Sequence, residues 1–244
     1  MSVLGPAINS PAAGKYSQMI TGIEQIFQDI DRSVQDFQQK TGLSCANGCG
    51  RCCLSPNVEA TEVEMYPIAR HLFRTGQADH WYTKAQESSF NGRCIFYKAD
   101  AFNPNKGRCG IYPFRPAMCR LYGFSSLIHK SGRRHLMTCA VIKEKEGLRM
   151  PQIQNMIDRG LDVPINKNFS SMIFQVHPVL GCRRWPINQA FKMAVESFGL
   201  FFSMKGGDFD GGISNQTKAP GPAGQKAGWS NEQTTAAATA GEGK

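Results

Sequence analysis

The sequence predicts a mainly α-helical protein with irregular loops and a short β-hairpin. Apolar residues recur at helical spacing near both ends of the part that is expected to fold. Two β-prone runs in the middle of the chain flank a turn sequence. The cysteine residues lie mostly between these features, in Gly- and Pro-rich stretches that suit irregular loops better than regular structure.

The composition of the two ends predicts a single folded domain over residues 16–204. Residues 205–244 hold nine Gly and seven Ala but few large apolar side chains. Such a segment cannot bury enough surface to offset the entropy lost on ordering, so we expect a disordered tail there. Residues 1–15, which contain two Pro, are expected to form a shorter disordered end.

The charge and the cysteine count restrict the classes of protein. The chain has 244 residues, nine Cys and a net charge of +9. No run of apolar residues is long enough for a membrane span, and the first residues do not resemble a secretory signal. We therefore expect a cytoplasmic protein whose cysteines are reduced thiols or metal ligands, because an odd number fits a disulfide framework poorly.

The clearest helix is expected over residues 16–40. Its apolar residues step alternately by four and three positions and form one stripe between Tyr16 and Phe37. This stripe has two interpretations. It packs on the core of its own domain, or it forms a short coiled-coil seam through which residues 16–37 bind a partner protein.

The remaining elements are less regular. A helix is expected from Thr61, which has capping-box spacing to Glu64, with Pro67 bending the helix or delaying its start. Three more helices are expected at residues 79–88, 152–159 and 186–204. Two β-prone runs, 121–128 and 135–142, are expected to form a hairpin around the turn 130–133. Residues 161–185 show no clear pattern.

The strongest chemical signal is a group of four cysteines, Cys45, Cys49, Cys52 and Cys53. Gly48 and Gly50 allow the backbone between them to turn tightly, so that several sulfurs can converge. Thiolates at this spacing suit Zn²⁺ or an iron–sulfur cluster. The adjacent Cys52 and Cys53 can serve one polynuclear site or two neighbouring sites.

A second motif follows, with Cys109 and Cys119 in a rigid loop that also contains Tyr112, Arg115 and Pro116. Cys94 precedes this motif and Cys139 follows it. Cys182 stands apart and is expected to be a spare thiol. His129 or His135, on either side of the hairpin turn, is a possible further ligand.

Together, the two motifs resemble the bacterial YkgJ-like cysteine-cluster family with the CxxCxxCC signature. The resemblance covers roughly residues 40–145, although Cys45 and Cys49 are separated by three residues where the family has two. The family is described as zinc- or iron-chelating and is distantly similar to flagellin lysine-N-methylase. The methylase activity is not carried over, because the sequence has no Gly-rich strand-to-helix loop for a methyl-donor cofactor.

The resemblance implies a metal site made by cysteines. The first six implied ligands are Cys49, Cys52, Cys53, Cys94, Cys109 and Cys119. Cys45 and Cys139 follow as further implied ligands. Together these cysteines would fill two four-thiolate sites or one cluster with spare thiols. Arg115 and Arg120 are expected beside the ligands, where cations reduce the negative charge of the thiolates. An iron–sulfur cluster is favoured over Zn.

Three kinds of function are compatible with these features. The first is a metal-binding protein whose cluster has a structural, electron-carrying or accessory role and no catalytic residue. The second is a cluster-dependent enzyme such as a protein-modifying transferase, for which no acid–base pair is evident. The third, a basic module that binds nucleic acid, is not expected, because the basic pairs lack a recognisable recognition motif.

Overall fold

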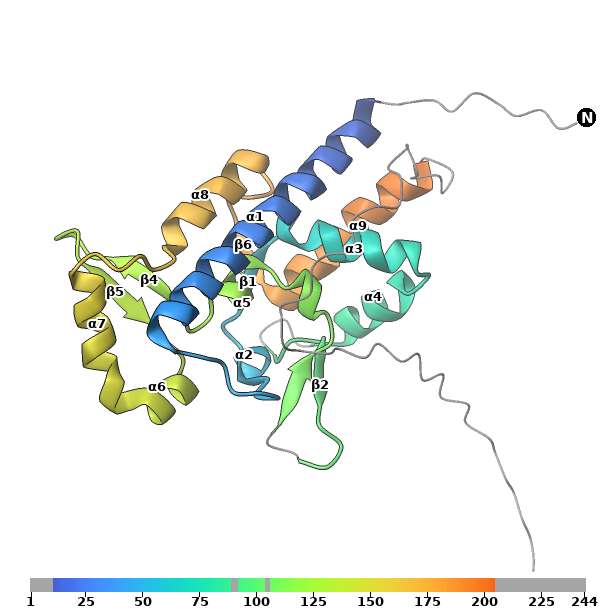
Figure 1. The fold of residues 1–244 in the computed structure, drawn as a ribbon. Coiled ribbons are helices and arrows are strands. Elements are labelled where there is room, and N and C mark those ends of the chain that lie inside the picture. The colour runs from blue at the N-terminus through green and yellow to red at the C-terminus, as the bar shows by residue number, and fades with distance from the viewer. Residues whose placement is uncertain (1–10, 89–91, 104–105, 205–244) are drawn as a thin grey trace, which may run out of the picture. The chain divides into compact units, whose positions relative to one another are not determined.

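Helix α1, Pro11–Thr41, is the longest helix of the computed structural model, which describes residues 11–88, 92–103 and 106–204 (Figure 1). Pro11 lies at its start, where proline is tolerated because the first N–H groups have no helical partner. Residues 11–15 are therefore helical, and their assignment to a disordered end was wrong. Residues 1–10 and 205–244, for which disorder was expected, lie outside the described residues.

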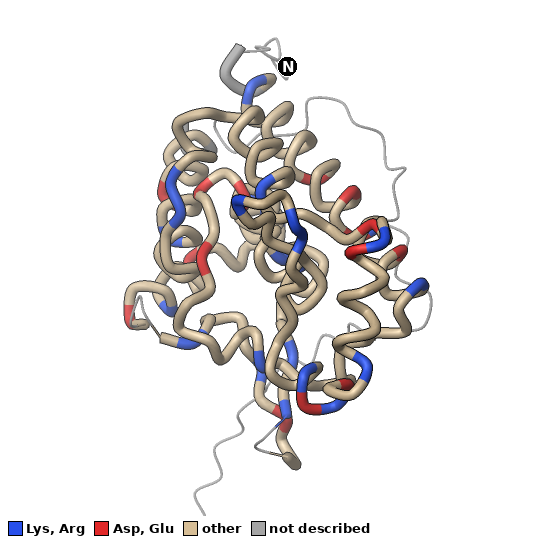
Figure 2. The backbone as a smooth tube through the Cα atoms, turned by 90° about the vertical axis from the view of Figure 1, so that its left-hand side faces the viewer, with Lys and Arg blue, Asp and Glu red and all other residues tan. Residues whose placement is uncertain are grey.

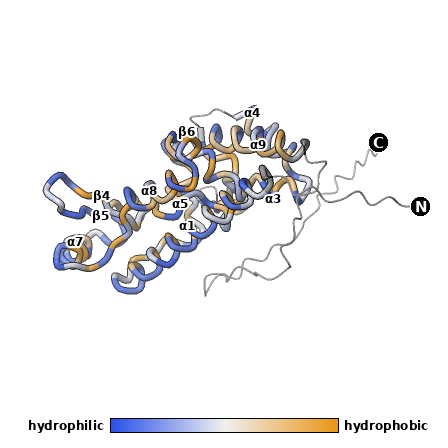
Figure 3. The backbone as a smooth tube through the Cα atoms, turned by 90° about the horizontal axis from the view of Figure 1, so that it is seen from above, coloured by the Kyte–Doolittle hydropathy of each residue, from blue (hydrophilic) through white to orange (hydrophobic). Residues whose placement is uncertain are grey.

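The apolar stripe of α1 packs inside the chain's own domain. Ile20, Ile23 and Ile30 are fully buried, and Phe37 near the end of the helix is buried as well. In Figure 3, hydrophobic and hydrophilic residues alternate along α1, as expected for a helix with one buried face. The interpretation of the stripe as a core face is confirmed, so the stripe itself is not exposed for a partner helix.

Helix α3, Tyr66–Arg74, packs against α1 (Figure 1). Helices α4, Ala78–Glu87, and α9, Ile187–Met204, pack against each other. A 3₁₀ turn at Val63–Met65 precedes α3, and Pro67 lies in the first turn of α3, so the proline delays the start of the helix as expected. Helix α9 packs against both α3 and α4.

The described residues form three short antiparallel strand pairs. Strand β1, Glu59–Thr61, pairs with β6, Arg184–Pro186. Strand β2, Tyr97–Ala99, pairs with β3, Gly107–Cys109. Strand β4, Ser125–Ile128, pairs with β5, Arg134–Met137. Only the last hairpin was predicted, and its strands are shorter than expected. Leu121 belongs to helix α5, Ala117–Leu121, and the second run passes into helix α6, Ala140–Glu146.

The remaining helices are α2, α7 and α8. Helix α7, Met150–Asp158, confirms the helix expected at 152–159. Helix α8, Asn166–Val176, was missed in the stretch without a clear pattern. The short α2, Arg51–Leu54, carries two of the clustered cysteines. The mainly α-helical fold class is thus confirmed. None of the described helices is long and apolar enough to cross a membrane.

Two hydrophobic cores meet along α1. The larger one contains the upper part of α1 with α3 and α9, and includes Cys53 and Cys94. The smaller one combines Phe37 with residues of the β4–β5 hairpin, α6 and α7, and Cys139 packs against it. Cys52, Cys109 and Cys119 also pack against the larger core, so five of the clustered cysteines border that core and only Cys139 borders the smaller one.

Candidate metal centre

The first cysteine loop is held by two glycines with positive φ. Gly48 has φ 64° and Gly50 has φ 58°, in the left-handed region that favours glycine. The amide of Gly107 donates to the Gly48 carbonyl at 3.0 Å. A Cβ atom at Gly50 would lie 2.7 Å from the Tyr97 ring and 2.8 Å from the Gly107 backbone. The loop therefore lies directly against the β2–β3 pair, and only glycine fits at residue 50.

Backbone contacts also bring the segments of Cys94 and Cys109 to α2. The amide of Cys94 donates to the Cys53 carbonyl at 2.9 Å. Cys109 ends β3 and stands opposite Tyr97 in the register of the strand pair. Two thiols that are far apart in the sequence thus become neighbours of Cys52 and Cys53 through backbone hydrogen bonds alone.

A buried carboxylate positions the helix that carries Cys119. Glu64 is 1% exposed. One of its oxygens accepts from the amide and hydroxyl of Thr61, both at 2.8 Å, and the other accepts from the Ala117 amide at 2.9 Å, at the start of α5. The Thr61–Glu64 pair seen in the sequence therefore forms, and it also caps α5, a role that the spacing did not reveal.

Five thiols form an inner group around Cys53. Hydrogen bonds to Cys109, Cys52 and Cys94 raise the pKa of the Cys53 thiol far above its ordinary value. The same proton sharing lowers the pKa of Cys52 to about 6 and lowers the pKa of Cys109. Burial, and then the charges of neighbouring thiols, raise the pKa of Cys119.

An outer group of thiols adjoins Cys52. Desolvation, followed by the charges of Cys49, Cys52 and Cys139, raises the pKa of Cys45 to about 11. Cys139 is also the N-cap of α6, where its sulfur accepts from the Ile142 amide at 3.4 Å. Cys52 therefore borders both groups.

The two arginines of the second motif have different roles. The charge of Arg115 favours the thiolate form of Cys52 and Cys109, whose pKa values the hydrogen bond with Cys53 lowers first, and it opposes the rise in pKa at Cys45 and Cys119 that burial causes first. Its guanidinium lies 3.6 Å from the Tyr112 ring centre. Arg115 thus stands where the sequence placed it, beside the thiols.

Arg120, by contrast, acts mainly on the loop. It is 7% exposed and donates to the carbonyls of Arg115 and Pro113, both at 2.6 Å, and to the Asp31 carboxylate of α1. The sequence predicts Arg120 directly beside the thiols. In the structure its side chain instead fixes the loop that carries Arg115. Asp31, its partner, gave no signal in the sequence.

The sulfurs hydrogen-bond one another rather than forming a ready-made cage. Within the described ranges, no three His, Cys, Asp or Glu side chains are grouped so that they could hold a metal ion. Cys182 lies outside both thiol groups, is exposed and donates to the Val179 carbonyl at 3.2 Å. His129 and His135 face each other across the hairpin, with ring centres 5.8 Å apart.

Two adjacent basic residues after the hairpin turn form ion pairs with acidic residues. Arg133 pairs with Asp158 at 2.7 Å, and Arg134 pairs with Asp162 at 3.4 Å. Figure 2 shows Lys and Arg interspersed with Asp and Glu along the backbone in that view.

The fold and the thiols define a small, mainly helical domain with two adjoining groups of cysteines that are suited to soft metals. Residues 44–150 match the model of the CxxCxxCC family, described as a putative zinc- or iron-chelating domain. This match covers a little under half of the chain and confirms the resemblance of the two cysteine motifs to the family. No curated protein and no solved structure matches the chain.

Proposed function

We propose that the domain holds an iron–sulfur cluster through its thiolates, with zinc as the alternative metal, in a structural, electron-carrying or accessory role. What supports this most is that thiols from separate segments of the chain shift one another's pKa: Cys109, Cys52 and Cys94 act on Cys53, and Cys49, Cys52 and Cys139 act on Cys45. Zn²⁺ needs four ligands at a structural site. Eight thiols in two groups that share Cys52 suit a polynuclear cluster, or two neighbouring sites, better than one mononuclear ion.

The chemistry of the donor set fits such a group. Thiols must lose their protons to bind a metal, and binding releases those protons. The thiols of Cys52 and Cys109 already have lowered pKa values, so they are the easiest to ionise. When bound, an iron–sulfur cluster supplies one-electron chemistry or structural cross-links, and hydrogen bonds to its sulfurs set its potential.

The surrounding residues supply charge and hydrogen bonds for a thiolate centre. Arg115 offsets negative charge that several thiolates would accumulate. The Thr138 hydroxyl, next to Cys139, is buried and has no hydrogen-bond partner among the described residues. It is therefore a spare donor at the edge of the outer group. Tyr122 lies close to the same thiols, since burial and then the charge of Cys139 raise the pKa of its hydroxyl.

The test is purification without oxygen, followed by measurement of iron, zinc and acid-labile sulfide and by visible spectroscopy. The proposal predicts a brown protein that contains iron and sulfide. Colourless protein with stoichiometric zinc would reverse the choice of metal, and protein without either metal would refute the proposal.

Two variants and a matched control assign the ligands. Cys52→Ser and Cys109→Ser are expected to lose metal and to unfold at lower temperature, because metal binding contributes to folding when the site forms with the fold. Cys182→Ser makes the same change outside both thiol groups and is expected to keep the metal. A Cys52→Ser protein with full metal content would refute that ligand.

A further inference from the structure

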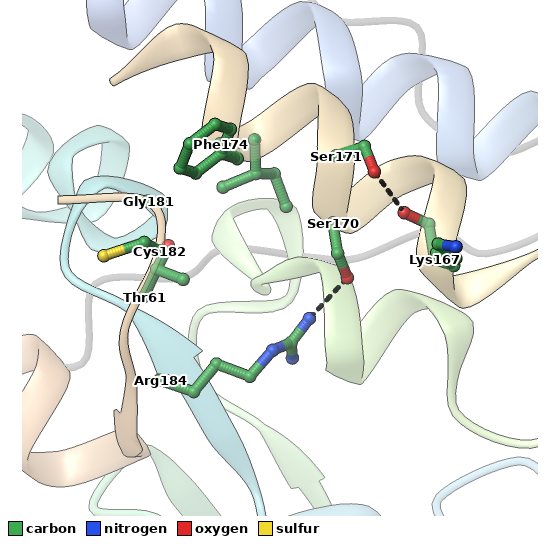
Figure 4. Close-up of a pocket in the computed structure, with 9 residues that line it drawn as sticks. Thr61, Lys167, Ser170, Ser171, Phe174, Gly181, Cys182 and Arg184 are labelled. Atoms are coloured by element: carbon green, nitrogen blue, oxygen red, sulfur yellow. Dashed lines mark hydrogen bonds between the residues drawn. The ribbon is translucent and has the colours of Figure 1, made fainter. Parts of the chain in front are cut away.

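A separate cavity lies between α8 and the segment that leads into β6. Its volume is about 250 Å³, and none of the eight clustered cysteines lines it. Figure 4 shows Arg184 reaching from β6 toward Ser170 on α8, with Thr61 and Cys182 on the same side as the backbone of Arg184. The cavity therefore has a charged side chain in its interior that the metal centre does not use.

The guanidinium of Arg184 is held in place but only partly satisfied. Arg184 stands opposite Thr61 in the β1–β6 pair, which fixes its backbone. Its Nη2 donates to the Ser170 hydroxyl at 2.7 Å. Its Nη1 is buried and has no hydrogen-bond partner among the described residues. A buried donor without an acceptor is unfavourable, and more so when the group is charged.

No carboxylate among the described residues forms an ion pair with Arg184. Glu64 contacts Thr61, but its oxygens already accept from Thr61 and from the Ala117 amide. The hydroxyl of Ser170 donates its own hydrogen to the Asn166 carbonyl at 2.9 Å. Lys167, which is exposed, adds a second positive charge to the lining. The cavity thus has surplus positive charge and a free N–H donor.

We propose that this cavity binds a small oxyanion, the phosphate or carboxylate group of a small molecule. An anionic oxygen accepts from Nη1 of Arg184, and Lys167 contributes charge from the rim. Hydrogen bonds between ionised partners are stronger than neutral ones, and guanidinium suits both kinds of oxyanion. The proposal does not depend on the metal centre, because no clustered cysteine lines the cavity.

The test is calorimetric titration of the full chain with inorganic phosphate, glycerol phosphate and succinate, at constant ionic strength. Saturable binding of at least one probe is expected. Tighter binding of glycerol phosphate than of phosphate points to a phosphorylated molecule, and preference for succinate points to a carboxylate. If none of the three probes binds saturably, the proposal is wrong.

Arg184→Gln is expected to weaken the binding at least about tenfold, since it removes a charge-assisted hydrogen bond. Arg183→Gln is the matched control, because it removes the same charge one residue away, where the guanidinium stacks 3.5 Å from the Trp185 ring centre. Equal weakening by both variants would show non-specific attraction and overturn the proposal. If Arg184→Gln does not fold, as judged by circular dichroism, Lys167→Met replaces it, with at least a threefold weakening expected and an unchanged affinity contradicting the proposal.

Discussion

Replacing Gly50 by Ala tests whether the first cysteine loop is held by its close approach to the β2–β3 pair. Gly48 and Gly50 both have positive φ, so an Ala at either residue costs about 1–2 kcal/mol of folding free energy. At Gly48 nothing lies within 4 Å of the added Cβ, whereas at Gly50 the Cβ meets the Tyr97 ring and the backbone of Gly107 below 3.0 Å. Overpacking of this kind adds about 1–3 kcal/mol.

The expected free energies of unfolding thus differ between two chemically identical substitutions in one loop. Gly50→Ala is destabilised by about 2 kcal/mol more than Gly48→Ala, which corresponds to a Tm lower by about 4–8 °C in a protein of this size. Thermal unfolding by circular dichroism, with metal content measured in parallel, gives both quantities. Equal loss of stability in the two variants would refute the reasoning that the loop is fixed by this contact.

Three other perturbations test the anchors and the thiols. Arg120→Met is expected to lower the free energy of unfolding by about 3 kcal/mol, because the carbonyls of Arg115 and Pro113 and the Asp31 carboxylate lose their donor. Asp31→Asn is expected to cost less than about 1 kcal/mol, since Asp31 is half exposed and an amide oxygen can still accept from Arg120; equal effects in denaturant titrations would contradict this. Glu64→Gln costs about 2 kcal/mol in the same titrations, because its amide cannot accept at both oxygen positions; an unchanged midpoint would contradict this. In metal-free protein, the alkylation rate of Cys52 is expected to rise between about pH 5 and 7 and then level off, because the pKa of Cys52 is about 6. Cys45, with a pKa of about 11, is expected to react fully only in alkaline solution despite its exposure. Peptide mass spectrometry measures both, and faster reaction of Cys45 than of Cys52 at pH 7 would refute this.

Local patterns predicted α1, α3, α4, α7 and α9 and one hairpin, and missed α2, α5, α6 and α8. The stripe from Tyr16 to Phe37 has helical period, and the structure buries it. The start of α1 was missed because Pro11 and Gly14 suggest a loop, although proline at a first helical position does not oppose a helix. The β1–β6 pair joins Thr61 to Arg184, and no local periodicity can indicate a contact between three-residue strands so far apart.

The sequence indicated the cysteines of the candidate site, but not the residues that hold their loops in place. The spacing of the cysteines predicts that the thiols converge, and in the structure charges and hydrogen bonds of neighbouring thiols shift the pKa values of Cys45, Cys52, Cys53, Cys109 and Cys119. The partition into groups depends on backbone contacts such as that between Cys94 and Cys53, which no spacing encodes. Glu64 and Asp31 support the second motif from distant segments, so sequence reasoning had no means of linking them to Cys119 or Arg120.

The most direct test of the central claim is a count of reactive thiols in metal-loaded native protein, compared with the count after chelation and unfolding. The chain has nine Cys. If eight of them hold metal, the loaded protein exposes one reactive thiol, which peptide mapping assigns to Cys182, and the unfolded, chelated protein exposes all nine. Reaction of most clustered cysteines in the metal-loaded native protein would contradict the account.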